Sequence, residues 1–174
     1  MPTEKKPEDC KGIMIYPQRV CITYKTMSYI LADAFEGGSN YWYEADSFKE
    51  PANFNNVSEE YHEKGRKPWA IEKAIEYPLN EGGEVIILVP EFHPCKTKRE
   101  GKPVFNYGKR GQDEMDDYDG YSAFSLNLTG IKKALTNPEF RKAPSFKKIL
   151  DENPDSNDAD AFLQFAIFGK RIFA

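Results

Sequence analysis

Apolar residues recur at helical spacing along three stretches of the chain, and each stretch predicts an amphipathic helix. In the first, the apolar stripe runs from Met27 to Phe35. Thr26 or Ser28 can cap the start of this helix, and Gly37 stands where a left-handed C-terminal cap is expected. Both ends of the first helix are therefore marked by residues that favour a helix boundary.

The remaining predicted helices are marked in the same way. Asn127 can cap a helix that continues to about Leu135, and Gly169 can end the last helix, which is expected to run from about Asp158 to Phe168. Two shorter helices, each with a proline at or next to its first position, are expected at 69–77 and 144–151.

Runs of β-branched and aromatic residues predict the strands. The stretch 84–89 contains Val-Ile-Ile-Leu-Val without interruption, which is typical of a strand covered on both faces at the centre of a sheet. The other strands are expected at 19–25, 39–45 and 122–126. Together these elements predict an α+β fold, with a small sheet of about four strands packed with about four helices.

The length of the chain and the lack of an evident linker predict one domain, 1–174. Residues 1–12 are mostly polar at their start and are expected to fray. Residues 91–120 form a long charged loop in which basic residues come first and acidic residues follow. Long loops of this kind are often functional.

Composition narrows the classes of protein that the chain can represent. The 174 residues include 24 Lys and Arg against 28 Asp and Glu, for a net charge of −4, and 14 % are aromatic. These values argue against a globally disordered chain and against a general nucleic-acid packaging protein. The longest apolar run is far shorter than the ~20 residues of a membrane helix, and no signal peptide is recognised, so a cytoplasmic protein is expected.

The cysteines and histidines are few and widely spaced. Cys10, Cys21 and Cys95 form no Cys-x-x-Cys pair, and His62 and His93 are the only histidines. This spacing supports neither a disulfide framework nor a metal site. We therefore expect free reduced thiols, and neither a metal nor a cofactor.

The segment 36–42 combines two glycines with polar and aromatic residues between a predicted helix and a predicted strand. The glycines allow a tight turn and close approach of a partner, and a carboxylate at a helix C-terminus is disfavoured by the helix dipole. One interpretation is an ordinary helix-to-strand turn with a core tryptophan. The other is a ligand-binding segment that consists of Glu36, Gly37, Gly38, Asn40, Tyr41 and Trp42.

The start of the last predicted helix is the second candidate segment. Asp155 is suited to the helix start, where it can accept backbone N–H groups. Asp160 and Gln164 are four residues apart and share a helix face. They form either a buried polar contact or part of a site. We expect this segment and the turn at 36–42 to lie near each other and to form the functional surface.

Both segments resemble a known family. Residues 33–42 resemble an A-x-E-G-G-x-N-Y-W motif, and residues 155–169 resemble a closing D…A-D-x-x-x-Q-x-A-x-F-G motif, of small uncharacterised proteins from bacteriophages and mobile elements. The resemblance spans roughly residues 19–172 and implies a phage or mobile-element origin and a role in the cytoplasm of a bacterial host. It implies no activity. This chain differs from the family in its long 91–120 loop and in its last residues.

Three functions follow as hypotheses. The first is a small accessory protein that binds a host protein or a small ligand without catalysis. The second is an enzyme in which Glu36, Asn40 and Asp160 act as acid, orienting group and base. The third is a nucleic-acid binder that uses the basic segment 96–110. No catalytic relay of Ser, His and Asp is recognisable, which favours the first hypothesis.

Overall fold

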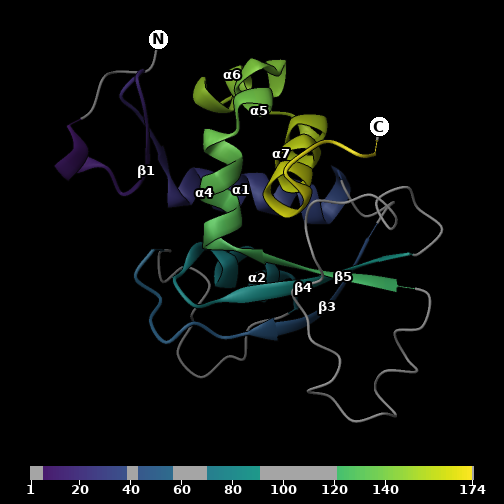
Figure 1. Cartoon of the computed structure of the whole chain (residues 1–174). Coiled ribbons are helices and arrows are strands. Elements are labelled where there is room, and N and C mark those ends of the chain that lie inside the picture. Colours follow the sequence, from purple (N-terminus) through teal and green to yellow (C-terminus); the bar gives the residue numbers. More distant parts are fainter. Residues whose placement is uncertain (1–5, 39–42, 57–69, 91–120, 174) are drawn as a thin grey trace.

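The computed structural model describes residues 6–38, 43–56, 70–90 and 121–173 and has an α+β fold, as predicted (Figure 1). Its main sheet is antiparallel and has the order β3-β4-β5. The predicted central strand is confirmed, because β4 lies between the two others. The strands are β3 (Glu44–Lys49), β4 (Glu84–Pro90) and β5 (Tyr121–Asn127).

A second, two-stranded antiparallel sheet lies before the first helix, where a single strand was predicted. It pairs β1 (Gly12–Ile15) with β2 (Val20–Thr23). The guanidinium of Arg141 donates to the backbone oxygens of Tyr16, at 2.7 Å, and Leu135, at 3.0 Å. This side chain therefore ties the turn of the hairpin to the helical part of the molecule.

Figure 1 shows α1 and α4–α7 gathered on one side of the main sheet, while α2 contacts α1 as well as β3 and β4. The short helix α5 was not predicted, whereas the others lie close to their predicted positions. The helices are α1 (Tyr24–Asp33), α2 (Ala70–Glu76), α4 (Leu128–Thr136), α5 (Pro138–Lys142), α6 (Pro144–Leu150) and α7 (Ser156–Phe168). Three further turns are η1 (Pro7–Asp9), the π-helical η2 (Ala34–Gly38) and η4 (Tyr77–Leu79).

The last helix is the centre of the hydrophobic core. Every residue of α7 from Asp158 onward is buried, and the helix contacts α1, α4, α6 and β5. A helix surrounded in this way has to be apolar on most of its surface. The ring of Phe168 packs edge to face on Phe124 of the sheet, with ring centroids 4.9 Å apart, and the ring of Phe165 packs at a tilt on Phe140 of α5, also with centroids 4.9 Å apart. Polar residues on α7 are therefore unusual and need partners.

Two predicted caps are confirmed at the ends of the long helices. The side chain of Asn127 accepts a hydrogen bond from the backbone N–H of Gly130 at 2.9 Å and starts α4. Gly169 ends α7 in the left-handed conformation, with φ of 71°. Gly130 also permits close packing, because a Cβ atom there would lie 2.5 Å from the carbonyl oxygen of Ala166 on α7.

The predicted boundaries of the first helix are wrong. The cap is Thr23, which accepts from the N–H of Thr26 at 3.1 Å, so α1 begins directly after β2. At its other end the helix continues into the π turn η2. Gly37 therefore does not form a left-handed cap, and among the described glycines only Gly82 and Gly169 have positive φ.

The expectation of free thiols is wrong for two of the three cysteines. Cys10 and Cys21 form a disulfide, with sulfur atoms 2.01 Å apart and Cα atoms 5.6 Å apart. The β1–β2 hairpin brings them together, because Met14 pairs with Cys21 and the chain enters β1 just after Cys10. The sequence did not reveal this pairing because β1 was not predicted.

Several predictions fall outside the described residues: the charged loop 91–120 with Cys95 and the basic segment 96–110, the proposed proline start of α2, and most of the strand at 39–45. The strand that follows them is β3. None of the described helices has the length and apolar character that crossing a bilayer requires.

Candidate functional site

The described part of the first candidate segment lies against the last helix, because η2 contacts α7. Glu36 and Gly37 are exposed on η2, and Gly38 ends it. Asn40, Tyr41 and Trp42 lie outside the described residues. The turn η2 and the helix α7 are therefore neighbours, and the functional surface expected from the two candidate segments stays a prediction.

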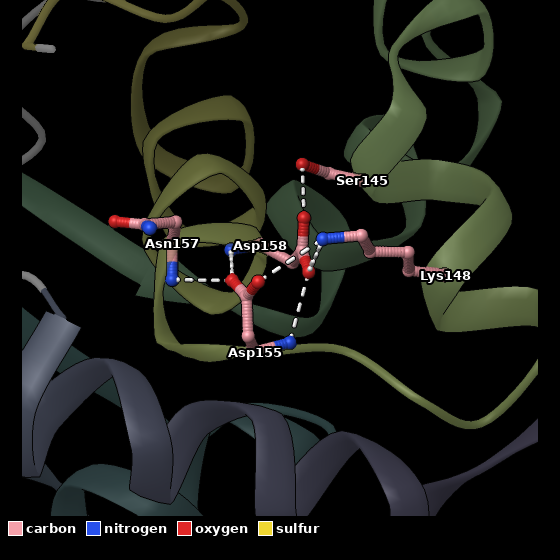
Figure 2. Close-up of polar contacts among 5 residues, drawn as sticks. All are labelled: Ser145, Lys148, Asp155, Asn157 and Asp158. Atoms are coloured by element: carbon pink, nitrogen blue, oxygen red, sulfur yellow. Dashed lines mark hydrogen bonds and ion pairs between the residues drawn. The ribbon is translucent and has the colours of Figure 1, made fainter.

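Asp155 is the N-cap of α7 (Figure 2). Its carboxylate accepts from the N–H groups of Asn157 and Asp158, at 2.9 and 3.1 Å, and its own N–H donates to the carboxylate of Asp158 at 2.8 Å. This reciprocal pair is a capping box, which satisfies N–H groups that a helix start otherwise leaves without acceptors. The described bonds of Asp155 thus serve the helix.

The same cluster joins α7 to α6. Asp158, with a side chain only 5 % exposed, accepts from the hydroxyl of Ser145 at 2.7 Å and lies 3.1 Å from the ammonium of Lys148. Lys148 also contacts Asp155 at 3.0 Å. Its hydrogen bonds to these two carboxylates raise its pKa, so Lys148 stays protonated at neutral pH and cannot act as a base toward Ser145. The cluster is built as a clamp between two helices.

The charge on Asp155 makes this clamp dependent on pH. The hydrogen bond from Lys148, followed by the backbone N–H of Asp158, lowers the pKa of Asp155 below its ordinary value of 3.8. A group whose pKa is lower in the folded protein than in the unfolded chain stabilises the fold at any pH above its pKa in the unfolded chain. This contribution is lost as the pH falls through its pKa in the folded protein.

We therefore expect Asp155→Asn, which keeps a capping oxygen but removes the charge, to be less stable than the wild type at neutral pH and to approach it in acid. Urea unfolding of both proteins from about pH 7 to about pH 2 measures this difference. The control is Asp151→Asn, at the end of α6, whose difference from the wild type should not follow this course. A constant difference for Asp155→Asn down to the lowest pH would contradict the assignment.

Asp160 and Gln164 form the buried contact that their spacing allowed. The amide nitrogen of Gln164 donates to the carboxylate of Asp160 at 2.9 Å. Gln164 is 0 % exposed and Asp160 is 2 % exposed. The same nitrogen donates to the carbonyl of Phe173 at 3.1 Å. The amide oxygen accepts from the N–H groups of Ile172 and Phe173, both at 2.8 Å. The side chain of Gln164 thus holds residues 172–173 on α7.

Tyr43, just after the first segment, lies close to this contact. Burial, and secondarily the negative charge of Asp160, raise the pKa of Tyr43 far above its ordinary value, so the phenol stays protonated. The ring also packs edge to face on Phe35 at 5.7 Å. A catalytic role for Asp160 would require a route for substrate to a side chain that is buried here, which disfavours the enzyme hypothesis.

A polar pocket of about 240 Å³ lies elsewhere, where the ends of all three strands of the main sheet meet the start of α4. Strand pairing places Lys49 opposite Glu84 and Glu84 opposite Asn127. Glu81 and Lys132 complete the charged lining. Two cationic and two anionic side chains therefore surround one small cavity.

A chain of hydrogen bonds fixes one wall of this pocket. The N–H of Gly130 donates to Asn127, the amide of Asn127 donates to the hydroxyl of Ser125, and this hydroxyl donates to Glu84, each at 2.9 Å. Ser125 is buried, so Glu84 is held from inside the sheet. Glu81 lies in the turn before β4. Burial raises the pKa of Tyr24 on α1, and the negative charge of Glu81 raises it further.

The sequence did not predict this pocket. The sequence Glu-Gly-Gly-Glu at 81–84 could have indicated it. The same combination of two glycines and a neighbouring carboxylate made the segment 36–38 a candidate. Gly82 adopts positive φ, and a Cβ atom on Gly83 would lie 2.1 Å from the carbonyl oxygen of Tyr77. The glycines let this turn pass close to η4 and bring both carboxylates to the end of the sheet.

No family model matches the chain, and no curated protein and no solved structure is similar to it at the level that would show a relationship. Within the described ranges there is no group of three or more His, Cys, Asp or Glu side chains that could hold a metal ion. The fold and the pocket thus define an α+β protein with a small polar site at the end of its sheet.

Proposed function

We propose that the protein is a small accessory protein that binds without catalysis, and that the strand-end pocket is its site for a small ligand. The observation that carries this proposal is the pairing of Lys49 and Lys132 with Glu81 and Glu84 around one cavity. Such a lining suits a small molecule that bears both a negative and a positive group. The cavity is smaller than the ~300 Å³ at which sites for drug-sized molecules begin, so the ligand is small.

The lining favours binding over chemistry. The described lining contains no Ser–His or Cys–His pair, in which a base activates the nucleophile of covalent catalysis. Glu84 is fixed by Ser125, which favours a preformed ionic contact.

Titration with probes of defined charge tests this site. The probes are glycine, β-alanine and γ-aminobutyrate, which carry both charges at increasing separation, with acetate and methylammonium as singly charged controls. We expect a dipolar probe to shift the NMR amide signals of Gly83 and Thr129, and the single charges to shift them far less. Equal responses to acetate and to every dipolar probe would contradict the pairing of charges.

Matched lysine variants make the test specific. Lys132→Ala removes a charge of the pocket and is expected to weaken binding of the best probe about tenfold, equivalent to about 1.4 kcal/mol. Lys147→Ala removes a charge from α6, beyond the other end of α4 (Figure 1), and should leave binding within about twofold. Equal loss in both variants would assign the effect to net charge alone.

A host protein is the second candidate partner. Tyr16 and Tyr29 are each 53 % exposed, and exposed tyrosines are typical of the residues that dominate protein interfaces. The nucleic-acid hypothesis depends on the segment 96–110, which lies outside the described residues, and it stays a prediction.

The origin and location of the protein also stay predictions. The two motifs of the sequence support a phage or mobile-element origin. The Cys10–Cys21 disulfide, in contrast, favours an oxidising compartment over the reducing cytoplasm of a bacterium.

A further inference from the structure

The charged side chains of the strand-end pocket do not pair with one another. Within the described ranges, no ion pair joins any two of the four, which are Lys49, Glu81, Glu84 and Lys132. The pairing of β3 with β4 nevertheless places Lys49 directly opposite Glu84, where opposite charges attract. The carboxylate of Glu84 is instead held from the strand on its other side, by the hydroxyl of Ser125 at 2.9 Å.

The start of α4 sets the direction of the hydrogen bonds that reach Glu84. The backbone N–H of Gly130 can only donate, so Asn127 turns its amide oxygen to Gly130 and its amide nitrogen to Ser125. The hydroxyl oxygen of Ser125 therefore accepts, and its single proton is left for Glu84. Ser125 is 6 % exposed, so bulk water competes little for this proton.

This bond engages only one of the two carboxylate oxygens of Glu84. The other oxygen accepts no hydrogen bond from the part of the chain that the structure describes, and Glu84 lines the pocket. A carboxylate that is already oriented loses less conformational freedom when it binds a cation. Glu81, in contrast, is exposed in the turn before β4. Glu84 is therefore the better-defined acceptor for a positive group.

The lining also indicates which kind of positive group fits. Quaternary ammonium groups are typically held over the faces of aromatic rings, and the described lining of this pocket contains no Phe, Tyr or Trp. A primary ammonium carries N–H donors and can give one to the second oxygen of Glu84. Such a charge-assisted hydrogen bond is about twice as strong as a neutral one.

We propose that Ser125 is a positioning residue of the pocket, which holds Glu84 away from Lys49 and leaves its second oxygen for the primary ammonium group of the ligand. The proposal rests on the function proposed above and deepens it. It names the ligand as a small primary amine that also carries an anionic group, and it names Glu84 as the acceptor of the ammonium.

NMR titration with glycine, β-alanine and γ-aminobutyrate, each compared with its N-trimethyl derivative, tests this assignment. The wild type should bind the best primary amine about tenfold more tightly than its derivative, and Ser125→Ala should bind that amine about tenfold more weakly. Ser125→Thr keeps a hydroxyl and should lose less. Ser28→Ala removes another buried hydroxyl, which bonds to Lys25 on α1, and should leave binding within about twofold.

The outcomes separate this proposal from the one on which it rests. No response of the wild type to any probe would overturn the pocket as the ligand site, and the role of Ser125 with it. Binding that Ser125→Ala leaves within about twofold of the wild type would overturn the role of Ser125 alone. Equal binding of an amine and its trimethyl derivative would overturn the selection of a primary ammonium.

The side-chain NMR signals of Lys49 test the role of Ser125 without a ligand. Glu84→Gln should change these signals little in the wild type, because the two side chains do not pair there. The same substitution should change them clearly in the Ser125→Ala background, where Glu84 can reach Lys49. Equal changes in both backgrounds would overturn the proposal.

Two glutamate variants keep the proposal testable if Ser125→Ala does not fold. Glu84→Gln keeps an oxygen for the hydroxyl of Ser125 but removes the charge, and it should weaken binding of the best amine about tenfold. Glu81→Gln removes the other negative charge of the pocket and should weaken binding less than about threefold. Equal losses in the two variants would overturn Glu84 as the acceptor of the ammonium.

Discussion

Gln164→Leu is expected to lower the free energy of unfolding by about 3 kcal/mol. Leucine has a similar size but cannot replace the bonds to Asp160, Ile172 and Phe173. Each buried polar group that loses its partner costs about 1–3 kcal/mol, and the loss is limited because Arg171 still donates to the carbonyl of Phe173 at 3.2 Å.

Urea unfolding followed by circular dichroism measures this loss, and two variants define its origin. Gln18→Leu makes the same change at an exposed position in the β1–β2 turn and should stay within about 0.5 kcal/mol of the wild type. Gln164→Glu keeps an oxygen for the two N–H groups but loses the donor and brings a second carboxylate to Asp160. Gln164→Glu should therefore also have a lower free energy of unfolding than the wild type, and this loss should be smaller at acidic pH. A Gln164→Leu variant as stable as Gln18→Leu would refute the structural role of Gln164.

Asp158→Ala is expected to cost about 2–4 kcal/mol. The substitution leaves the hydroxyl of Ser145 and the N–H of Asp155 without their acceptor, at a position that is almost completely buried. It also removes one of the two carboxylate partners of Lys148, the other being Asp155. Most of the cost should come from the buried hydrogen bonds, because Lys148 is 47 % exposed and ion pairs of exposed groups contribute little.

Comparison with Lys148→Met separates the two contributions in the same unfolding experiment. That variant removes the ion pairs and leaves the bonds of Asp158 to Ser145 and Asp155 in place, so it should lose much less stability than Asp158→Ala. If Lys148→Met lost as much stability as Asp158→Ala, the clamp between α6 and α7 drawn in Figure 2 would be mainly ionic, and this prediction would be wrong.

The candidate residues show how far sequence reasoning reaches into a site. The spacing of Asp160 and Gln164 correctly placed them on one helix face, because that relation depends only on the period of the helix. Whether the pair served the fold or a ligand depended on residues 172–173, which return to the helix after Gly169. The pocket was missed for a related reason, since it joins the ends of three strands to the start of α4.

The sequence by itself determined the elements whose signals are local. These are the central strand β4, the cap of α4 at Asn127, the end of α7 at Gly169 and the α+β class of the fold. A capping side chain and a run of apolar residues act within a few positions of the chain, so they can be recognised without knowledge of the rest.

Only the tertiary structure decided which residues meet across long separations. The Cys10–Cys21 disulfide needed the β1–β2 hairpin, Thr23 became the cap of α1 because β2 ends there, and Asp158 became a partner of Ser145 only when α6 packed on α7. Such contacts depend on burial and on the packing of whole elements, and many sequences with the same local pattern could pack differently. The polar groups that were left in the interior then took the partners that packing brought within reach.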